Sequence, residues 1–193
     1  MPTPAASLRG RRGSHIVWYD EFKKLSDEIG QVNLHLAQAL ATTPTSELRS
    51  ADRMNDLWLI VGHVFALEAC YWPHLKGSNP APLDTDGLKA GMVRRLHRKA
   101  ECQGKLDPLL PHLRFVDPVF GVRNLYAHAF GRRRGLKHPD WLPPQKLKEY
   151  GFEADGPEDD LDTPWWPLRH VAFSACVSPI MKLAEVIRDH IKP

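Results

Sequence analysis

Apolar residues recur at alternating intervals of three and four along most of this chain, which is the pattern of amphipathic helices packed in a bundle. The pattern covers residues 17–40, 46–72, 85–102, 118–130 and 163–191. Pro179 predicts a kink in the last of these helices. No stretch shows a convincing alternation with the period of two that predicts a strand. The pattern therefore predicts an all-α protein, a bundle of about five helices.

The stretches without helical periodicity divide the chain into parts. Residues 1–14 are rich in Pro, Ala, Gly and Arg, and we expect a disordered N-terminal tail there. Residues 15–193 are long enough for a single helical domain with its own core. Within it, residues 131–163 form a long loop insertion between the fourth and fifth helices. The insertion begins basic and ends acidic, so we expect its acidic part to fold onto the basic part, of the same chain or of a partner.

Composition narrows the class of protein. Of the 193 residues, 42% are hydrophobic and 25% are charged, as in ordinary soluble globular proteins. The net charge of +3 permits a nucleic acid as partner but does not require one. The three cysteines are widely spaced, without a C-x-x-C pair, which is typical of reduced thiols in the cytosol. Because no apolar run approaches the ~20 residues of a membrane span, we expect a cytoplasmic protein without a membrane segment.

The stretch 118–130 combines clear helix ends with an unusual polar face. Asp117-Pro118 predicts an N-cap followed by proline at the first helical position, and Gly131 predicts the C-terminal stop. Three polar residues project from the side opposite the apolar face. They are Arg123, Asn124 and His128. At about 100° per residue, the second and third lie side by side and the arginine lies on their flank. Such residues also occur on ordinary solvated faces, so their spacing alone does not distinguish a functional site from a solvent-exposed face.

The order Arg123-Asn124-Leu125-Tyr126-Ala127-His128 resembles the R-x-x-x-x-H motif of the HEPN superfamily, including the polar residue directly after the arginine. The resemblance implies a small all-α bundle of four or five helices with the motif on a late helix, here a HEPN-like bundle with a long insertion. Many members are metal-independent ribonucleases that act as dimers, often in toxin–antitoxin, anti-phage or RNA-processing systems. Other members are inactive binding modules.

The resemblance implies a function with RNA as substrate and a homodimer as the acting form. Metal-independent cleavage uses the neighbouring 2′-hydroxyl as nucleophile and needs a base, an acid and positive charge on the phosphate. His128 suits proton transfer, Arg123 suits the phosphate, and Asn124 suits orienting the imidazole or holding an oxygen. One chain supplies one such histidine, and a symmetric dimer supplies two. An antitoxin or a nucleotidyltransferase is a possible further partner. The alternative is an inactive HEPN-like module that binds RNA or a protein.

Two residues of the second helix raise separate questions. Glu68 falls within the apolar stripe, where a carboxylate is costly unless it is paired or hydrogen-bonded. It either reaches the rim or bonds an aromatic residue, or it holds the guanidinium of Arg123 across the bundle as a supporting residue. His63 lies off the stripe, and we expect it at the surface.

Basic residues cluster before and after the motif, either as solvated faces or as contacts for RNA phosphates. The candidate RNA-binding residues are Arg94, Arg95, Arg98, Lys99, Arg132, Arg133 and Arg134. No cluster of His and Cys has the spacing of a zinc site, and no glycine-rich phosphate-binding loop is present. We therefore expect neither a metal nor another cofactor.

Overall fold

The computed structural model describes residues 14–41 and 45–192. It is 72% helical, which confirms the all-α prediction. The helices in this part of the chain are α1 (Ser14–Leu40), α2 (Thr45–Tyr71), α3 (Gly91–Cys102), α4 (Leu106–Ala129), α5 (Pro144–Glu149) and α6 (Arg169–His190). Two short strands, β1 (Phe152–Ala154) and β2 (Trp165–Pro167), form one antiparallel pair. Residues 1–13 of the predicted N-terminal tail lie outside the described residues.

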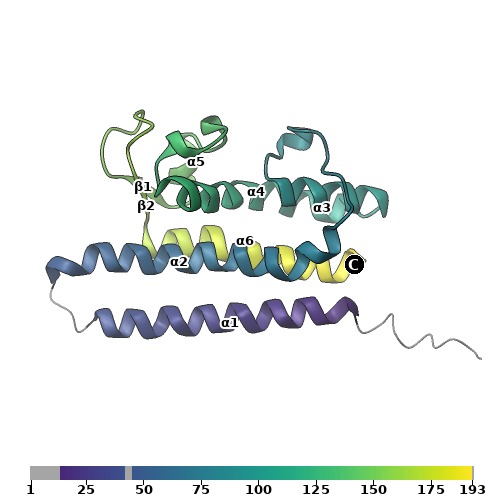
Figure 1. Ribbon diagram of the computed structural model, residues 1–193, viewed down its shortest axis with the longest axis horizontal. Helices are drawn as coiled ribbons and strands as arrows, with labels where there is room; N and C mark the ends of the chain where they lie inside the picture. Colours follow the sequence, from purple (N-terminus) through teal and green to yellow (C-terminus); the bar gives the residue numbers. More distant parts are fainter. Residues whose placement is uncertain (1–13, 42–44, 193) are drawn as a thin grey trace, which may run out of the picture.

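The helices are arranged in layers, with α2 and α6 side by side in the middle (Figure 1). Helix α1 covers one side of this pair, and α3 and α4 cover the other. The core lies where α2, α4 and α6 meet, and its centre includes Leu67, Val122 and Cys176, which are completely buried. No helix among the described residues is both long enough and apolar enough to cross a bilayer.

Helix α4 starts earlier than the sequence pattern predicts. It begins at Leu106 and continues through Pro111 and Pro118, so Asp117 is an interior residue and not the N-cap. Leu109 and Leu113, which precede Asp117, are completely buried. Burial of this apolar face stabilises the helix across prolines that, from local sequence alone, indicate a boundary.

The carboxylate of Asp117, which lies on α4, forms hydrogen bonds with the start of α3. Its Oδ1 accepts hydrogen bonds from the backbone N–H groups of Lys89 and Ala90, at 3.0 and 2.7 Å, directly before α3. Its Oδ2 accepts the indole N–H of Trp141 at 2.9 Å. Asp117 therefore joins α3 and the segment after α4 to the middle of α4. Burial raises the pKa of Asp117, and these hydrogen bonds oppose the increase.

The segment predicted as a loop insertion, residues 131–163, is folded. It contains α5, the 3₁₀ turns Arg133–Gly135 and Pro139–Trp141, and strand β1. Leu142 and Leu147 are completely buried, so the segment contributes to the core. Its acidic part folds onto basic residues of the same chain, with ion pairs of 2.7 Å in both Arg134–Asp162 and Lys148–Glu158. Strands of three residues are too short to show a period of two, which is why the sequence did not predict them.

Candidate functional site

Arg123 is held between α2 and α4 by three neighbours. One Nη2–H donates to Oε1 of Glu68 on α2, forming an ion pair. An Nη1–H donates to Oδ1 of Asn124 at 2.8 Å. The guanidinium carbon lies 5.2 Å from the ring centroid of Phe65. The structure therefore places Glu68 against Arg123, which is one of the two arrangements expected for this carboxylate.

The ion pair lies in a partly desolvated position. The side chains of Arg123 and Glu68 are 18% and 21% exposed. Burial raises the pKa of Glu68, while the charge and hydrogen bonds of Arg123 oppose that increase. Because Glu68 holds one edge of the guanidinium and Phe65 lies against it, Arg123 has little freedom to rotate.

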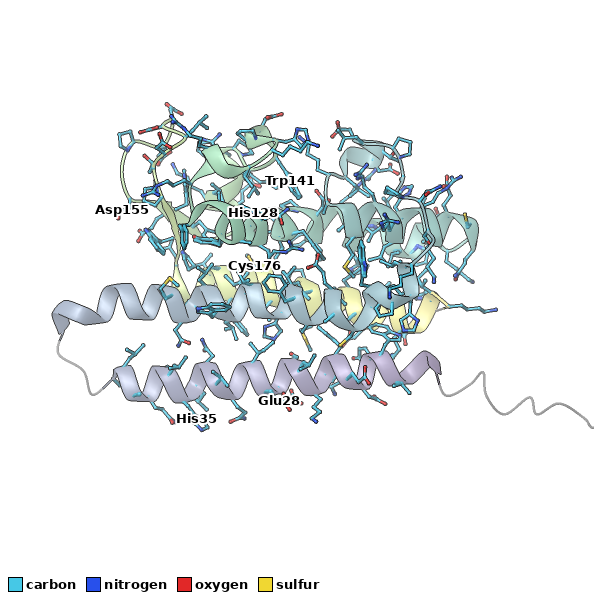
Figure 2. The ribbon with its side chains drawn as sticks, in the orientation of Figure 1. Glu28, His35, His128, Trp141, Asp155 and Cys176 are labelled. Atoms are coloured by element: carbon cyan, nitrogen blue, oxygen red, sulfur yellow. The ribbon has the colours of Figure 1, made fainter. Side chains whose placement is uncertain are left out.

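The other two motif residues do not act on each other. The Oδ1 atom of Asn124 accepts from Arg123, so Asn124 is engaged with the guanidinium. His128 lies near the end of α4 with an exposed side chain, and the described residues give its ring no hydrogen-bond partner (Figure 2). Positions 123 and 128 differ by about 140° around a helix. A single chain therefore directs Arg123 toward α2 and His128 toward solvent.

The basic residues of α3 hold the connection between α2 and α3. Arg94 donates to the carbonyl of Ala81 at 2.9 Å, and Lys99 donates to the carbonyl of His74 at 2.7 Å. Arg95 donates to the carbonyl of Ser78. The fourth residue, Arg98, pairs with Glu101 on the surface of the same helix. These contacts give the cluster a structural role, and its binding of RNA stays a prediction.

The three arginines after α4 have different environments. Arg133 is buried, Arg134 pairs with Asp162, and Arg132 has an exposed side chain. They follow the C-terminal end of α4, whereas α3 lies beside its N-terminal part (Figure 1). The fold therefore does not bring the two predicted basic clusters together. Of these seven residues, Arg132 lies nearest in sequence to His128.

A groove of about 350 Å³ lies between α2 and the end of α4, next to Phe65 and Arg123. Its aromatic walls are Trp58, Phe65, Tyr126, Phe130 and Trp166. Trp58, Phe65 and Phe130 remain 60%, 45% and 78% exposed. All three belong to the apolar pattern of residues 46–72 and 118–130, and such a pattern predicts that they face the core. The apolar stripe on α2 is wide enough to face both the core and the groove. This width is the feature of the sequence that could have indicated that Trp58 and Phe65 are exposed.

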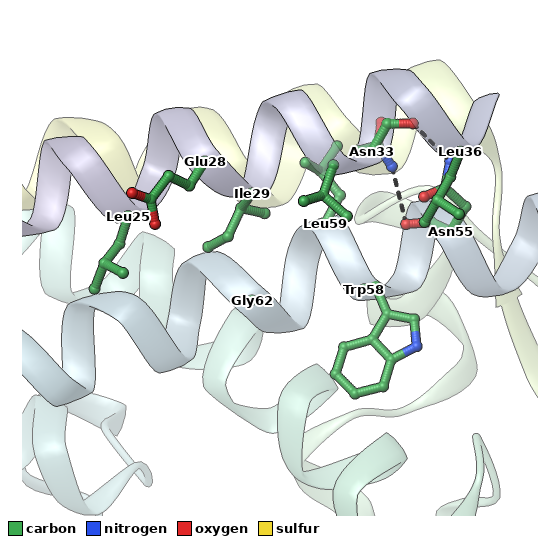
Figure 3. Close-up of a pocket in the computed structure, with 10 residues that line it drawn as sticks. Leu25, Glu28, Ile29, Asn33, Leu36, Asn55, Trp58, Leu59 and Gly62 are labelled. Carbon is green, nitrogen blue, oxygen red and sulfur yellow. Dashed lines mark hydrogen bonds between the residues drawn. The ribbon is translucent and has the colours of Figure 1, made fainter. Parts of the chain in front are cut away.

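A second apolar groove, of about 430 Å³, lies between α1 and α2. Figure 3 shows Asn33 and Asn55 on facing helices, each donating its side-chain amide to the other's backbone carbonyl at 3.0 and 3.1 Å. Trp58 is part of the lining of both grooves, and Figure 3 shows its ring on the side of α2 away from α1. The lining of this second groove includes Glu28 but no histidine, cysteine, lysine or arginine, so it lacks the groups needed for the predicted chemistry.

His63 is buried, which contradicts the expectation that it lies at the surface. Its Nε2 lies 2.9 Å from the hydroxyl of Ser26 on α1, and its Nδ1 lies 2.7 Å from the carbonyl of Leu59. Burial lowers the pKa of His63. The ring lies off the stripe of α2, as expected, but α1 covers that side of the helix.

Comparison with known proteins gives no match to this chain, whether with family models, curated proteins or solved structures. Within residues 14–41 and 45–192, no group of three or more His, Cys, Asp or Glu side chains is arranged to hold a metal ion. The site is therefore described by its own residues, Arg123 with Glu68 and Asn124, exposed His128, and the aromatic groove beside them.

Proposed function

We propose that this protein is a metal-independent endoribonuclease of HEPN type that acts in the cytoplasm, as a toxin or a phage-defence component. The observation that carries the proposal is the fixed guanidinium of Arg123. A guanidinium has five N–H donors, and Glu68 and Asn124 each accept one. One hydrogen remains on each Nη, and this pair can bind a phosphate oxygen while Glu68 maintains the orientation.

His128 is the proton-transfer residue in this proposal. The 2′-oxygen forms a bond to phosphorus, the bond to the 5′-oxygen breaks, and the product carries a cyclic phosphate. A base removes the 2′-proton and an acid protonates the leaving 5′-oxygen. An imidazole can both accept and donate a proton, so an exposed one suits either step.

A second copy of the chain completes the site. Within one chain Arg123 and His128 point in different directions, and one histidine cannot serve as base and acid in the same step. A two-fold dimer brings two guanidinium groups and two imidazoles to one cleft. We therefore propose a homodimer with RNA bound along its axis. An antitoxin or a nucleotidyltransferase partner would silence such an enzyme by covering or modifying this cleft.

The second candidate is an inactive module that binds RNA or a protein. The observation that favours it is that Asn124 is engaged with Arg123, which leaves the ring of His128 without an orienting partner among the described residues. An imidazole whose tautomer is not set by a neighbour is a weaker catalyst.

The experiment incubates the purified protein with fluorophore-labelled RNA in EDTA and compares it with His128→Ala, Arg123→Ala and Arg123→Lys. The matched control is His35→Ala, because His35 is also exposed but lies on α1, far from the motif in Figure 2. We expect cleavage that survives chelation, is unchanged in His35→Ala and falls at least about 100-fold in His128→Ala. Circular dichroism checks that each variant is folded, and light scattering measures the mass of the particle.

Wild-type protein that leaves every RNA intact while binding it with steep salt dependence would favour the inactive module. Cleavage that is equal in His128→Ala and wild type would overturn the catalytic assignment. Growth arrest on expression, relieved by His128→Ala but not by His35→Ala, would support the role as a toxin.

A further inference from the structure

We propose that the aromatic groove between α2 and α4 binds a base of single-stranded RNA beside the phosphate held by Arg123. The inference rests on the proposed function, because it names the part of the substrate that this site takes. Aromatic side chains that stack on unpaired bases are the usual means of binding single-stranded RNA.

The aromatic residues of the groove come from α2, from the end of α4 and from β2. Trp58 and Phe65 are seven residues apart on α2, so they lie on the same face of that helix. Phe130 and Trp166 approach from the end of α4 and from β2. Trp58 is 60% exposed and Phe130 is 78% exposed. A cluster of large aromatic side chains left open to solvent indicates a binding surface.

The backbone at Phe130 has an unusual conformation. Its φ and ψ are 49° and 47°, the left-handed conformation that helix ends usually assign to glycine. Gly131 follows directly with a φ of 86°, so two consecutive residues have a positive φ and the first of them is phenylalanine. Because the ring is mostly exposed, burial does not compensate for this conformation. The strained backbone is explained if the ring contacts a ligand.

The interior of the groove and its edge differ in charge. The lining of the groove includes no charged side chain. The guanidinium of Arg123 lies against Phe65 at its edge, and Arg132 follows two residues after Phe130 with an exposed side chain. An uncharged aromatic interior with the guanidinium of Arg123 at its edge is complementary to a nucleotide, whose base is planar and whose phosphate is anionic.

The experiment measures binding without cleavage. The probe is a fluorescent single-stranded DNA hexamer, which lacks the 2′-hydroxyl. A second probe for comparison is the same hexamer with abasic sites in place of its nucleotides' bases. Fluorescence anisotropy gives Kd for wild type, Trp58→Ala, Phe130→Ala and Phe130→Gly. The matched control is Phe173→Ala, because Phe173 is 44% exposed on α6 and is not part of the groove.

We expect the three groove variants to bind the base-bearing hexamer about 5- to 100-fold more weakly, with Phe173→Ala unchanged. The abasic hexamer should bind with the same Kd to wild type, to the three groove variants and to Phe173→Ala. Equal Kd values for the base-bearing hexamer in every variant would overturn the inference. So would a fall from dimer to monomer mass in Trp58→Ala with unchanged binding per chain, because the groove would then be a contact between two copies.

The two proposals fail separately. If His128→Ala abolishes RNA cleavage and Trp58→Ala leaves it unchanged, the base-binding groove is refuted and the nuclease proposal stands. Base-dependent binding of the hexamer by a protein that cleaves no RNA would keep the groove and remove the nuclease.

Discussion

The ion pair between Glu68 and Arg123 allows the sharpest prediction, made with Glu68→Gln. The substitution keeps the size of the side chain and an oxygen acceptor, and it removes the negative charge. Both partners are about one-fifth exposed, with exposed fractions of 21% and 18%. Breaking a fully buried pair costs about 3–5 kcal/mol, whereas pairs on the surface contribute about 0.2–1 kcal/mol.

Two effects reduce the cost from the upper of these limits. Arg123 keeps its hydrogen bond to Asn124 and its contact with the ring of Phe65. Burial also raises the pKa of Glu68, so ionised Glu68 already carries a cost of desolvation that the glutamine escapes. We therefore expect Glu68→Gln to lower the free energy of unfolding by about 1–2 kcal/mol, close to the value of a hydrogen bond between charged groups.

Urea denaturation followed by circular dichroism measures the difference, with the slope against urea checked for constancy. The control is Glu185→Gln, which removes a carboxylate from an ion pair of 2.9 Å on the surface of α6, where the partners are 59% and 40% exposed. We expect the control to change the free energy of unfolding by less than about 0.5 kcal/mol. A loss in Glu68→Gln no larger than in Glu185→Gln would refute the reasoning, since Arg123 would then not depend on Glu68.

Three further changes test the fold around the site. Asp117→Asn should lower the free energy of unfolding in urea by about 1–2 kcal/mol, because the amide nitrogen then faces the indole N–H of Trp141. Adding Trp141→Phe to this variant should recover part of that loss, and an unchanged free energy of unfolding in Asp117→Asn would contradict the hydrogen bonding. Burial lowers the pKa of His63 from 6.5, so protonation in the folded state is unfavourable and stability is lost as pH falls below 6.5. Between pH 7 and 5.5 the wild type should lose more stability than His63→Gln, and parallel pH profiles of the two proteins would exclude this assignment. Gly151→Ala should lower the free energy of unfolding by more than about 2 kcal/mol, because φ is +79° and a Cβ would lie 2.6 Å from a backbone nitrogen of α6. Gly77→Ala is the control, with φ of +83° and open space around the Cβ, and it should cost only about 1 kcal/mol. Equal losses in the two variants would show that α6 does not restrict position 151.

The helices whose limits agreed best with prediction are those whose signals are local. Residues 17–40 and 46–72 were predicted from apolar periodicity, and α1 and α2 span Ser14–Leu40 and Thr45–Tyr71. The start of α4 was predicted wrongly at Asp117, since its side chain has the chemistry of an N-cap. That carboxylate instead bonds to residues nearly thirty positions earlier, a contact that no local pattern encodes.

The sequence by itself determined the class of fold and the spacing of Arg123 and His128 on one helix, because both follow from a period set by the backbone. Only the tertiary structure decided what each side chain meets. It placed Glu68, 55 positions earlier, against the guanidinium, buried His63 beneath α1, and left Trp58 and Phe130 open beside the motif. The physical reason is that helix periodicity assigns a residue to a face, whereas the packing of neighbouring helices decides whether that face is covered.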